Sequence, residues 1–332
     1  MPHMKNSLTA LLLLCIAFTG FNACKNDVAL NADYKEIMVV YGLLDINDTV
    51  HYVRIERAYQ NTNATAQSIA QKPDSLYFDS LDVKLVESVT GTVFQLTKEV
   101  TTVKDSGYFQ NKVNVLYRFK GALNPQRTYT LYAKNPKTNY QATASTAVIG
   151  NPSRFIYPAG DTIDLLAGKQ MKISFTTGIN AKAYDLFFRF RWNEYDSVTN
   201  AFLGSKYLDY YLERSKTITG SISVPELMES SSQTDDIINF IGGALVPKKG
   251  VKRQMTDIDV CHAGATDDLN VYLDISKPSI GIVQKKPEFS NVTNGYGIFT
   301  SRNVYFKYHH CNFYTNQTLR KNSATKTLGF FE

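Results

Sequence analysis

The sequence predicts a mainly β protein with two β-rich domains, because its apolar residues alternate and turn signals separate the alternating segments. Residues 186–193 carry apolar side chains at every second position. The other segments with this alternation are 51–59, 113–119 and 304–308. A period of two is typical of antiparallel strands with one buried and one solvated face. Asn-Pro turn signals at a strand spacing of about ten residues favour sandwiches or barrels.

Composition narrows the class of protein further. The 332 residues are 43% hydrophobic, which is enough for two domains at about 100–200 residues each. This content excludes a disordered chain, and four Cys are too few for a small disulfide scaffold. The net charge of +6 is spread over 36 basic and 30 acidic residues without a basic stripe, so we expect no nucleic-acid partner.

Residues 1–23 match a signal peptide. Lys5 precedes an apolar run at 8–18, which is shorter than the roughly twenty residues of a membrane-spanning helix. Ala23 followed by Cys24 resembles the lipobox of bacterial lipoproteins, in which the Cys takes a diacylglyceryl group and becomes the N-terminus. This resemblance implies a lipid on Cys24 and a tether over 24–35. The alternative is an ordinary cleaved signal with an incidental Cys.

The residue after the Cys bears on location. Lys25 rather than Asp follows Cys24, which looks like sorting to the outer membrane instead of retention in the inner membrane. We therefore expect an outer-membrane lipoprotein of the cell envelope. The periplasmic and the cell-surface faces both stay open.

The first predicted domain is a β-sandwich over 36–149. Residues 123–133 resemble the turn and strand of immunoglobulin and fibronectin type III domains, in which a strand Tyr bonds back to the preceding corner. Tyr129 holds that place, and 140–144 follows as the closing strand. Asn151-Pro152 supplies the boundary.

The second predicted domain, over 150–314, is β-rich with two short helices. Segments 170–176 and 184–195 are predicted to form a strand pair. Further strands are predicted over 206–213, 217–224 and 297–311.

The two helices are predicted from their start signals. The first helix is predicted to begin near Pro225, because proline is tolerated in the first turn of a helix. Its apolar face is predicted to continue at 237–241. Thr266 is predicted to cap the second helix. Residues 315–332 are predicted to be a polar, basic and loose tail.

The four Cys have different fates. Cys15 leaves with the signal peptide and Cys24 is the lipid site, so the mature body keeps Cys261 and Cys311. Two Cys in an oxidising compartment predict one disulfide between them.

A motif near the C-terminus carries a family resemblance. Residues 289–299, with Asn-Gly-Tyr-Gly-Ile-Phe at 294–299, resemble a stretch of an uncharacterised Bacteroidetes lipoprotein family, the domain of unknown function 4249. Segments 39–44 and 129–133 and the helix predicted near 267–276 also fit that family. The resemblance covers most of 24–311. It implies an envelope lipoprotein, often encoded beside TonB-dependent outer-membrane receptors, and no established activity.

The glycines and carboxylates have structural interpretations. Gly295 and Gly297 invite comparison with a phosphate loop, but no Gly-Lys-Ser/Thr follows, so a tight turn is favoured. Asp257 and Asp259 are predicted to be solvated strand residues. The sequence has no Gly-x-Ser-x-Gly and no His-Glu-x-x-His pattern, so we expect no enzyme and assign no catalytic residue. An envelope hydrolase stays open because catalytic groups meet in space, not in sequence.

A cluster of His and Cys has the composition of a zinc site. Its members, besides the two Cys, are His262, His309 and His310. Neighbours along a strand point to opposite faces, so these ligands cannot all converge on one ion. We therefore favour a disulfide with packed or exposed histidines and expect no cofactor, with a metal site as the alternative.

Tyr207, Tyr210 and Tyr211 are the candidate ligand surface. Tyrosine combines apolar area with a polar tip, which suits sugars or a protein partner. The alternative is the ordinary enrichment of aromatic residues in β-sheets.

The leading hypothesis is a non-catalytic envelope binding or accessory module associated with an outer-membrane, TonB-dependent transport system. The second hypothesis is a carbohydrate- or metal-binding surface protein.

Overall fold

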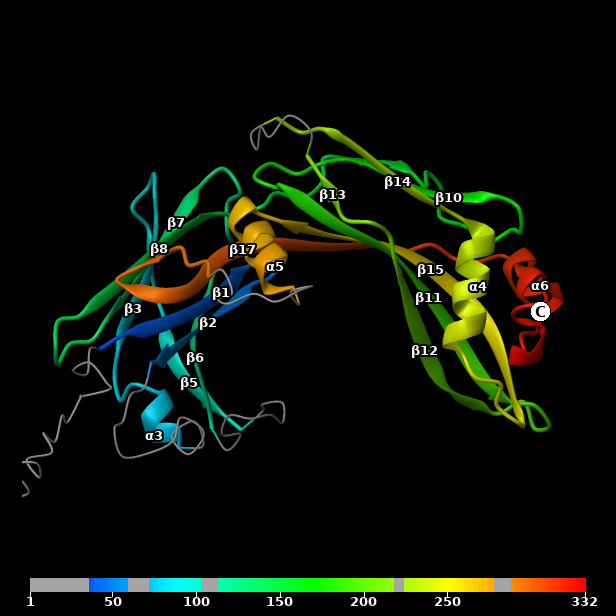
Figure 1. Ribbon diagram of the computed structural model, residues 1–332, viewed down its shortest axis with the longest axis horizontal. Helices are drawn as coiled ribbons and strands as arrows, with labels where there is room; N and C mark the ends of the chain where they lie inside the picture. The colour runs from blue at the N-terminus through cyan, green and yellow to red at the C-terminus, as the bar shows by residue number, and fades with distance from the viewer. Residues whose placement is uncertain (1–35, 59–71, 103–112, 218–223, 278–287) are drawn as a thin grey trace, which may run out of the picture. The chain divides into compact units, whose positions relative to one another are not determined.

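The computed structural model of the chain describes residues 36–58, 72–102, 113–217, 224–277 and 288–332 (Figure 1). Residues Glu36–Glu332 form one compact unit. Strands dominate, with four α-helices in the described ranges, so the prediction of a mainly β fold is confirmed. None of these helices is both long enough and apolar enough to cross a membrane. The predicted signal peptide, Cys24 and the tether lie outside the described residues.

A nine-stranded sheet contains strands from both ends of the sequence. Its order is β12, β11, β15, β17, β1, β2, β6 and β5, with β13 beside β11. The bounds are β1 Met38–Leu44, β2 Val50–Arg57, β5 Thr97–Thr101, β6 Asn114–Lys120, β11 Ala183–Asp196, β12 Phe202–Tyr211, β13 Ser215–Lys216, β15 Val251–Ala265 and β17 Gly295–Lys307. The first half of β17 pairs in parallel with β1, and its second half pairs antiparallel with β15.

The first core lies between the β1–β2–β6 region and a five-stranded sheet of order β16, β8, β7, β3 and β4. The bounds are β3 Asp82–Glu87, β4 Val93–Gln95, β7 Thr128–Lys134, β8 Gln141–Ala147 and β16 Val292–Thr293. His51, Val53 and Ile55 of β2 point inward, as their alternation predicts. Helix α3 (Pro73–Leu76) also contributes to this core through the buried Leu76.

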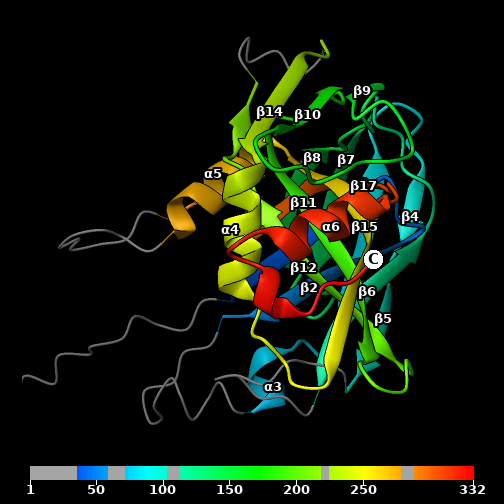
Figure 2. The same ribbon diagram turned by 90° about the vertical axis from the view of Figure 1, so that its right-hand side faces the viewer.

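The second core lies between the β11–β15 region and a three-stranded sheet of order β14, β10 and β9. The bounds are β9 Arg154–Tyr157, β10 Gln170–Thr176 and β14 Leu227–Gln233. Leu186, Phe188, Phe190 and Trp192 of β11 are all buried here, as predicted. Helices α4 (Thr234–Ala244) and α6 (Phe313–Lys321) lie beside each other (Figure 2). Both add apolar residues to the second core.

Three predictions about these elements are wrong. Segments 170–176 and 184–195 do not pair, because β10 and β11 lie in different sheets on either side of the second core. Residues 227–233 form strand β14, so the helix predicted from Pro225 begins only at Thr234. The residues after 314 are not a loose tail: they form most of α6 and the 3₁₀-helix η1 (Lys326–Leu328), and Leu319, Leu328 and Phe330 are buried. Only a few apolar residues in that segment face the core, so its polar composition concealed them.

The predicted start of the second helix is confirmed. Helix α5 (Asp267–Ser276) begins after Thr266, whose hydroxyl accepts a hydrogen bond from the Leu269 backbone N–H at 3.3 Å. Asp267 and Asp268 lie in its first turn, where negative charge is favourable.

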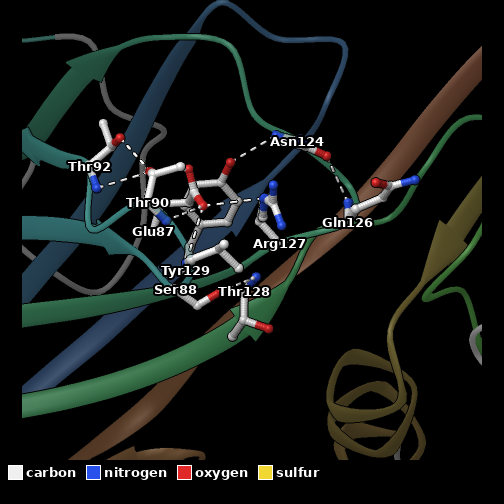
Figure 3. A network of polar contacts seen from close by, with 10 residues as sticks. Glu87, Ser88, Thr90, Thr92, Asn124, Gln126, Arg127, Thr128 and Tyr129 are labelled. Carbon is white, nitrogen blue, oxygen red and sulfur yellow. Dashed lines mark hydrogen bonds and ion pairs between the residues drawn. The ribbon is translucent and has the colours of Figure 1, made fainter.

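The predicted tyrosine corner is also present. The Tyr129 hydroxyl accepts a hydrogen bond from the Asn124 backbone N–H at 2.8 Å (Figure 3). Strand β11 has a corner that the sequence did not reveal, because the Tyr184 hydroxyl accepts from the Gly178 N–H at 2.9 Å. The predicted division into two domains near residue 150 stays a prediction, since β17 joins strands of both regions in one sheet.

The Asn-Gly motif is a turn between β16 and β17. Asn294 has a φ of 54° and Gly297 a φ of 104°. A Cβ atom at Gly297 would lie 2.1 Å from the Val40 carbonyl oxygen, so only glycine allows β17 to approach β1 here. The predicted turn is present at Asn294, but the positive φ of the turn belongs to Asn294, and Gly297 lies inside β17, where it permits the close approach of β1.

Candidate binding surface

One face of the β12–β11–β15–β17 sheet points away from the second core. Its side chains come from alternate positions of these strands and of the residues that follow β17, and we call it the aromatic–arginine face. The face comprises Phe187, Arg189, Arg191, Tyr207, Asp209, Tyr211, Asp257, Asp259, Cys261, Phe306, Tyr308 and His310. The strand registers arrange these side chains in rows across the sheet, from an aromatic end to a polar end.

The aromatic end is organised by Phe187. This side chain is opposite Tyr211 on one neighbouring strand and opposite Cys261 on the other, and Cys261 is opposite Phe306. The Phe187 ring centroid is 4.8 Å from that of Tyr211 and 6.0 Å from that of Phe306. The row therefore forms a continuous aromatic strip.

Arg189 occupies the middle of the face. Its Nε donates to Asp209 Oδ1 at 2.7 Å and its Nη2 donates to Asp209 Oδ2 at 2.8 Å. Its guanidinium carbon lies 4.3 Å from the Tyr207 ring centroid and 4.9 Å from that of Phe306. The bidentate pair raises the pKa of Arg189 and fixes the group between two rings.

Arg191 is held by a carboxylate with no solvent exposure. Its Nε donates to Asp259 Oδ2, and the Asp259 side chain is 0% exposed. Burial raises the pKa of Asp259, and the Arg191 guanidinium opposes that rise. The prediction that Asp259 is solvated is wrong, because its charge is paired across the sheet instead.

The three predicted tyrosines do not form one surface. Tyr207 and Tyr211 are 58% and 63% exposed on the aromatic–arginine face. Tyr210 lies between them in the strand and points to the opposite side, where its hydroxyl is 2.9 Å from Ser232 Oγ and its ring contacts Phe240. The structure adds Tyr308, which is 67% exposed and which the sequence alternation had assigned to a buried face.

A small polar hollow adjoins the polar end of the face. Its volume is about 330 Å³. The residues that line it are Arg191, Asn193, Ser205, Lys206, Tyr207, Thr256 and Asp257. Most of these come from directly paired positions, since Arg191 is opposite both Tyr207 and Asp257, and Asn193 is opposite Ser205.

Cys261 and Cys311 do not form the predicted disulfide, and both are free thiols. The Cys311 N–H donates to the carbonyl of Thr256, five residues before Cys261 on β15. At about 3.3 Å per residue, Thr256 lies about 16 Å from Cys261 along β15. Cys311, which is bonded to Thr256, is therefore far from Cys261. A disulfide needs Cα atoms about 4.4–6.8 Å apart.

The predicted metal candidates do not converge. His262 lies between the rings of Phe175 and Tyr305 in the second core, and burial lowers its pKa to about 3. His309 is buried, whereas His310 is exposed and places its Nδ1 2.7 Å from Asp257 Oδ1. In the described residues, no group of three or more His, Cys, Asp or Glu side chains is arranged to hold a metal ion.

A second hollow lies elsewhere in the fold, beside α5. It has a volume of about 500 Å³, and its lining includes Tyr41, Leu43, Tyr52, Tyr272, Arg54 and Arg302. It contains none of the residues that the sequence nominates as a site. The aromatic–arginine face contains two of the three candidate tyrosines, Tyr207 and Tyr211, and is therefore the stronger candidate.

Sequence reasoning missed Arg189, Asp259 and Phe306 as members of the face. Alternation did place Arg189 and Arg191 on the side of β11 opposite the core. No local pattern shows that β11, β12 and β15 assemble with β17, because these strands are distant from β17 in the sequence.

Comparison with known proteins adds no family. No protein-family model matches the chain, and no curated protein matches it either.

Proposed function

We propose that this chain is a non-catalytic binding or accessory module of the bacterial envelope, held at the outer membrane by a lipid on Cys24. We further propose that it acts with a TonB-dependent outer-membrane transport system, as the resemblance to the domain of unknown function 4249 implies. The observation that carries the proposal is the aromatic–arginine face, which supplies a surface for a partner.

The chemistry of that face suits a protein partner. Tyr, Phe and Arg are enriched in protein interfaces, and the rings of Tyr and Phe provide large contact areas with few rotatable bonds. Arg189 and Arg191 are already paired with Asp209 and Asp259, so docking does not leave their charges unpaired. The exposed rings of Tyr211 and Tyr308 can then be buried against an apolar patch of a receptor.

Anchoring is tested by removing the lipid site. Cys24→Ala is expected to move the protein from the membrane fraction to the soluble fraction, because an acyl chain gains about 0.8 kcal/mol per buried CH₂ group. Fractionation of cell extracts measures the shift. An unchanged membrane fraction would contradict the anchoring.

Partnership is tested by affinity capture of the full chain from detergent-solubilised envelope through a C-terminal tag. We expect a TonB-dependent receptor to co-purify. Capture in which no such receptor is enriched over an untagged strain would contradict this part of the proposal.

Carbohydrate binding is the second candidate function. The observation that favours it is the polar hollow of about 330 Å³ beside the exposed Tyr207 ring.

A further inference from the structure

We propose that the polar hollow beside Tyr207 is a subsite for a neutral saccharide unit. The inference rests on the proposed function, because it takes the aromatic–arginine face to be a binding face. It goes further by assigning a ligand class to one end of that face. A volume of about 330 Å³ lies within the range of about 300–1,000 Å³ that is usual for ligand pockets.

The balance of charges favours an uncharged ligand. Arg191 and Lys206 contribute positive charge to the hollow, and Asp257 contributes negative charge. The buried Asp259 also pairs with Arg191, so two carboxylates offset two cations. A phosphate or carboxylate ligand would find no net positive charge here, whereas sugar hydroxyls need only donors and acceptors.

The aromatic part of the subsite is Tyr207. Its ring is 58% exposed, and the Arg189 guanidinium lies over it at 4.3 Å. Because Asp209 holds Arg189 with two hydrogen bonds, this contact restrains the ring before any ligand arrives. A restrained, exposed ring offers its apolar surface to the C–H groups of a sugar at little cost in entropy.

The polar part consists of side chains that hydrogen bonds hold in place. Asn193 Oδ1 accepts from Ser205 Oγ at 2.7 Å and its Nδ2 donates to the Tyr195 hydroxyl at 3.4 Å, which orients the amide. Asp257 Oδ1 contacts His310 Nδ1 at 2.7 Å, which orients the carboxylate. Planar amide, carboxylate and guanidinium groups in one hollow match the paired donors and acceptors of neighbouring hydroxyls on a sugar ring.

The test uses the full chain purified in detergent. Neutral hexasaccharides of glucose, mannose, xylose and galactose serve as probes, with oligogalacturonate of the same length as the anionic comparison. Isothermal titration calorimetry measures binding. We expect at least one neutral hexasaccharide to bind, and oligogalacturonate to bind at least about tenfold more weakly.

Two substitutions locate the subsite. Tyr207→Ala and Asn193→Ala are each expected to weaken binding about tenfold or more, since a well-buried contact is worth about 1.4 kcal/mol or more. Tyr296→Ala is the matched control, because Tyr296 is an equally exposed tyrosine outside the face. Equal thermal unfolding midpoints show that the variants are folded, and Tyr207→Phe, which keeps the ring, is expected to retain binding.

Several outcomes would overturn the inference. These are no binding by any neutral hexasaccharide, stronger binding of oligogalacturonate, or binding that Tyr207→Ala and Asn193→Ala leave unchanged. Loss of receptor capture in Tyr207→Ala without any saccharide binding would assign the hollow to the protein interface instead. Saccharide binding without receptor capture would overturn only the proposed partnership.

Discussion

His262 is the most unusual single residue of the second core. Its ring is stacked with Phe155, Phe175 and Tyr305, and neither ring nitrogen has a hydrogen-bond partner among the described residues. Burial lowers its pKa from 6.5 to about 3, so the folded protein keeps it neutral. The residue therefore packs as an aromatic ring while carrying the cost of two buried polar atoms.

We predict that His262→Phe stabilises the protein by about 1 kcal/mol or more at pH 7, because it removes unsatisfied polar atoms and keeps a ring. The substitution also changes the pH dependence. In the wild type the unfolded chain binds a proton below pH 6.5 that the folded chain refuses until about pH 3, so stability falls as the pH falls through this window. Urea unfolding at pH 7 and pH 5 measures both effects. A destabilised variant with an unchanged pH slope would contradict this account.

The two free thiols predict that reducing agents do not change the stability of the protein. Burial raises the pKa of Cys261 and of Cys311, and both are free. We expect a reductant to leave the urea midpoint unchanged and native protein to react slowly with a thiol reagent that labels both Cys after unfolding. A midpoint that falls on reduction would indicate a disulfide.

Among the elements, β17 depends most on one backbone position. Gly297 has a φ of 104°, and any side chain there would meet the Val40 carbonyl of β1. We predict that Gly297→Ala destabilises the protein by about 3 kcal/mol or more. Gly91→Ala is the matched control, since Gly91 also has a positive φ but open space around it, and should cost about 1 kcal/mol. Equal effects of the two substitutions on the thermal midpoint would contradict the close approach of β17 to β1.

The two tyrosine corners are each held by a hydrogen bond between a Tyr hydroxyl and a backbone N–H. Tyr129→Phe and Tyr184→Phe each leave a backbone N–H without its acceptor, at a cost of about 1–3 kcal/mol. We expect the larger loss for Tyr184→Phe, because its partner bond to Gly178 is fully buried, whereas that of Tyr129 is partly buried. Denaturant unfolding decides the order, and a larger loss for Tyr129→Phe would contradict it.

Local patterns in the sequence predicted local elements well. Alternation of apolar residues predicted which residues of β2 and β11 point inward. Thr266 predicted the start of α5, and the motif at Asn294 predicted a turn. Pairing partners were not predictable in this way, because the register of β15 between β11 and β17 depends on contacts distant in sequence. The sequence therefore placed only part of the aromatic–arginine face: Tyr207 and Tyr211 lie exposed on it, and the arginines and Tyr308 were added by the assembled sheet.

At the scale of the whole molecule, the long sheet places two different surfaces in one unit. The aromatic–arginine face is on the side of the sheet opposite the second core. The hollow beside α5 is lined by residues of β1 and β2, which also contribute to the first core. The proposed lipid on Cys24 precedes both. On the proposed function, binding at the face would bring a partner to the membrane surface.

Photo-crosslinking in intact cells tests whether the aromatic–arginine face contacts a TonB-dependent receptor. A photoreactive amino acid replaces Tyr211 or Tyr308 on the face, and Tyr296 in a control outside it. If the face contacts the receptor, we expect a crosslinked TonB-dependent receptor from the first two positions and none from Tyr296. Crosslinking from Tyr296 alone, or equal crosslinking from all three positions, would contradict it.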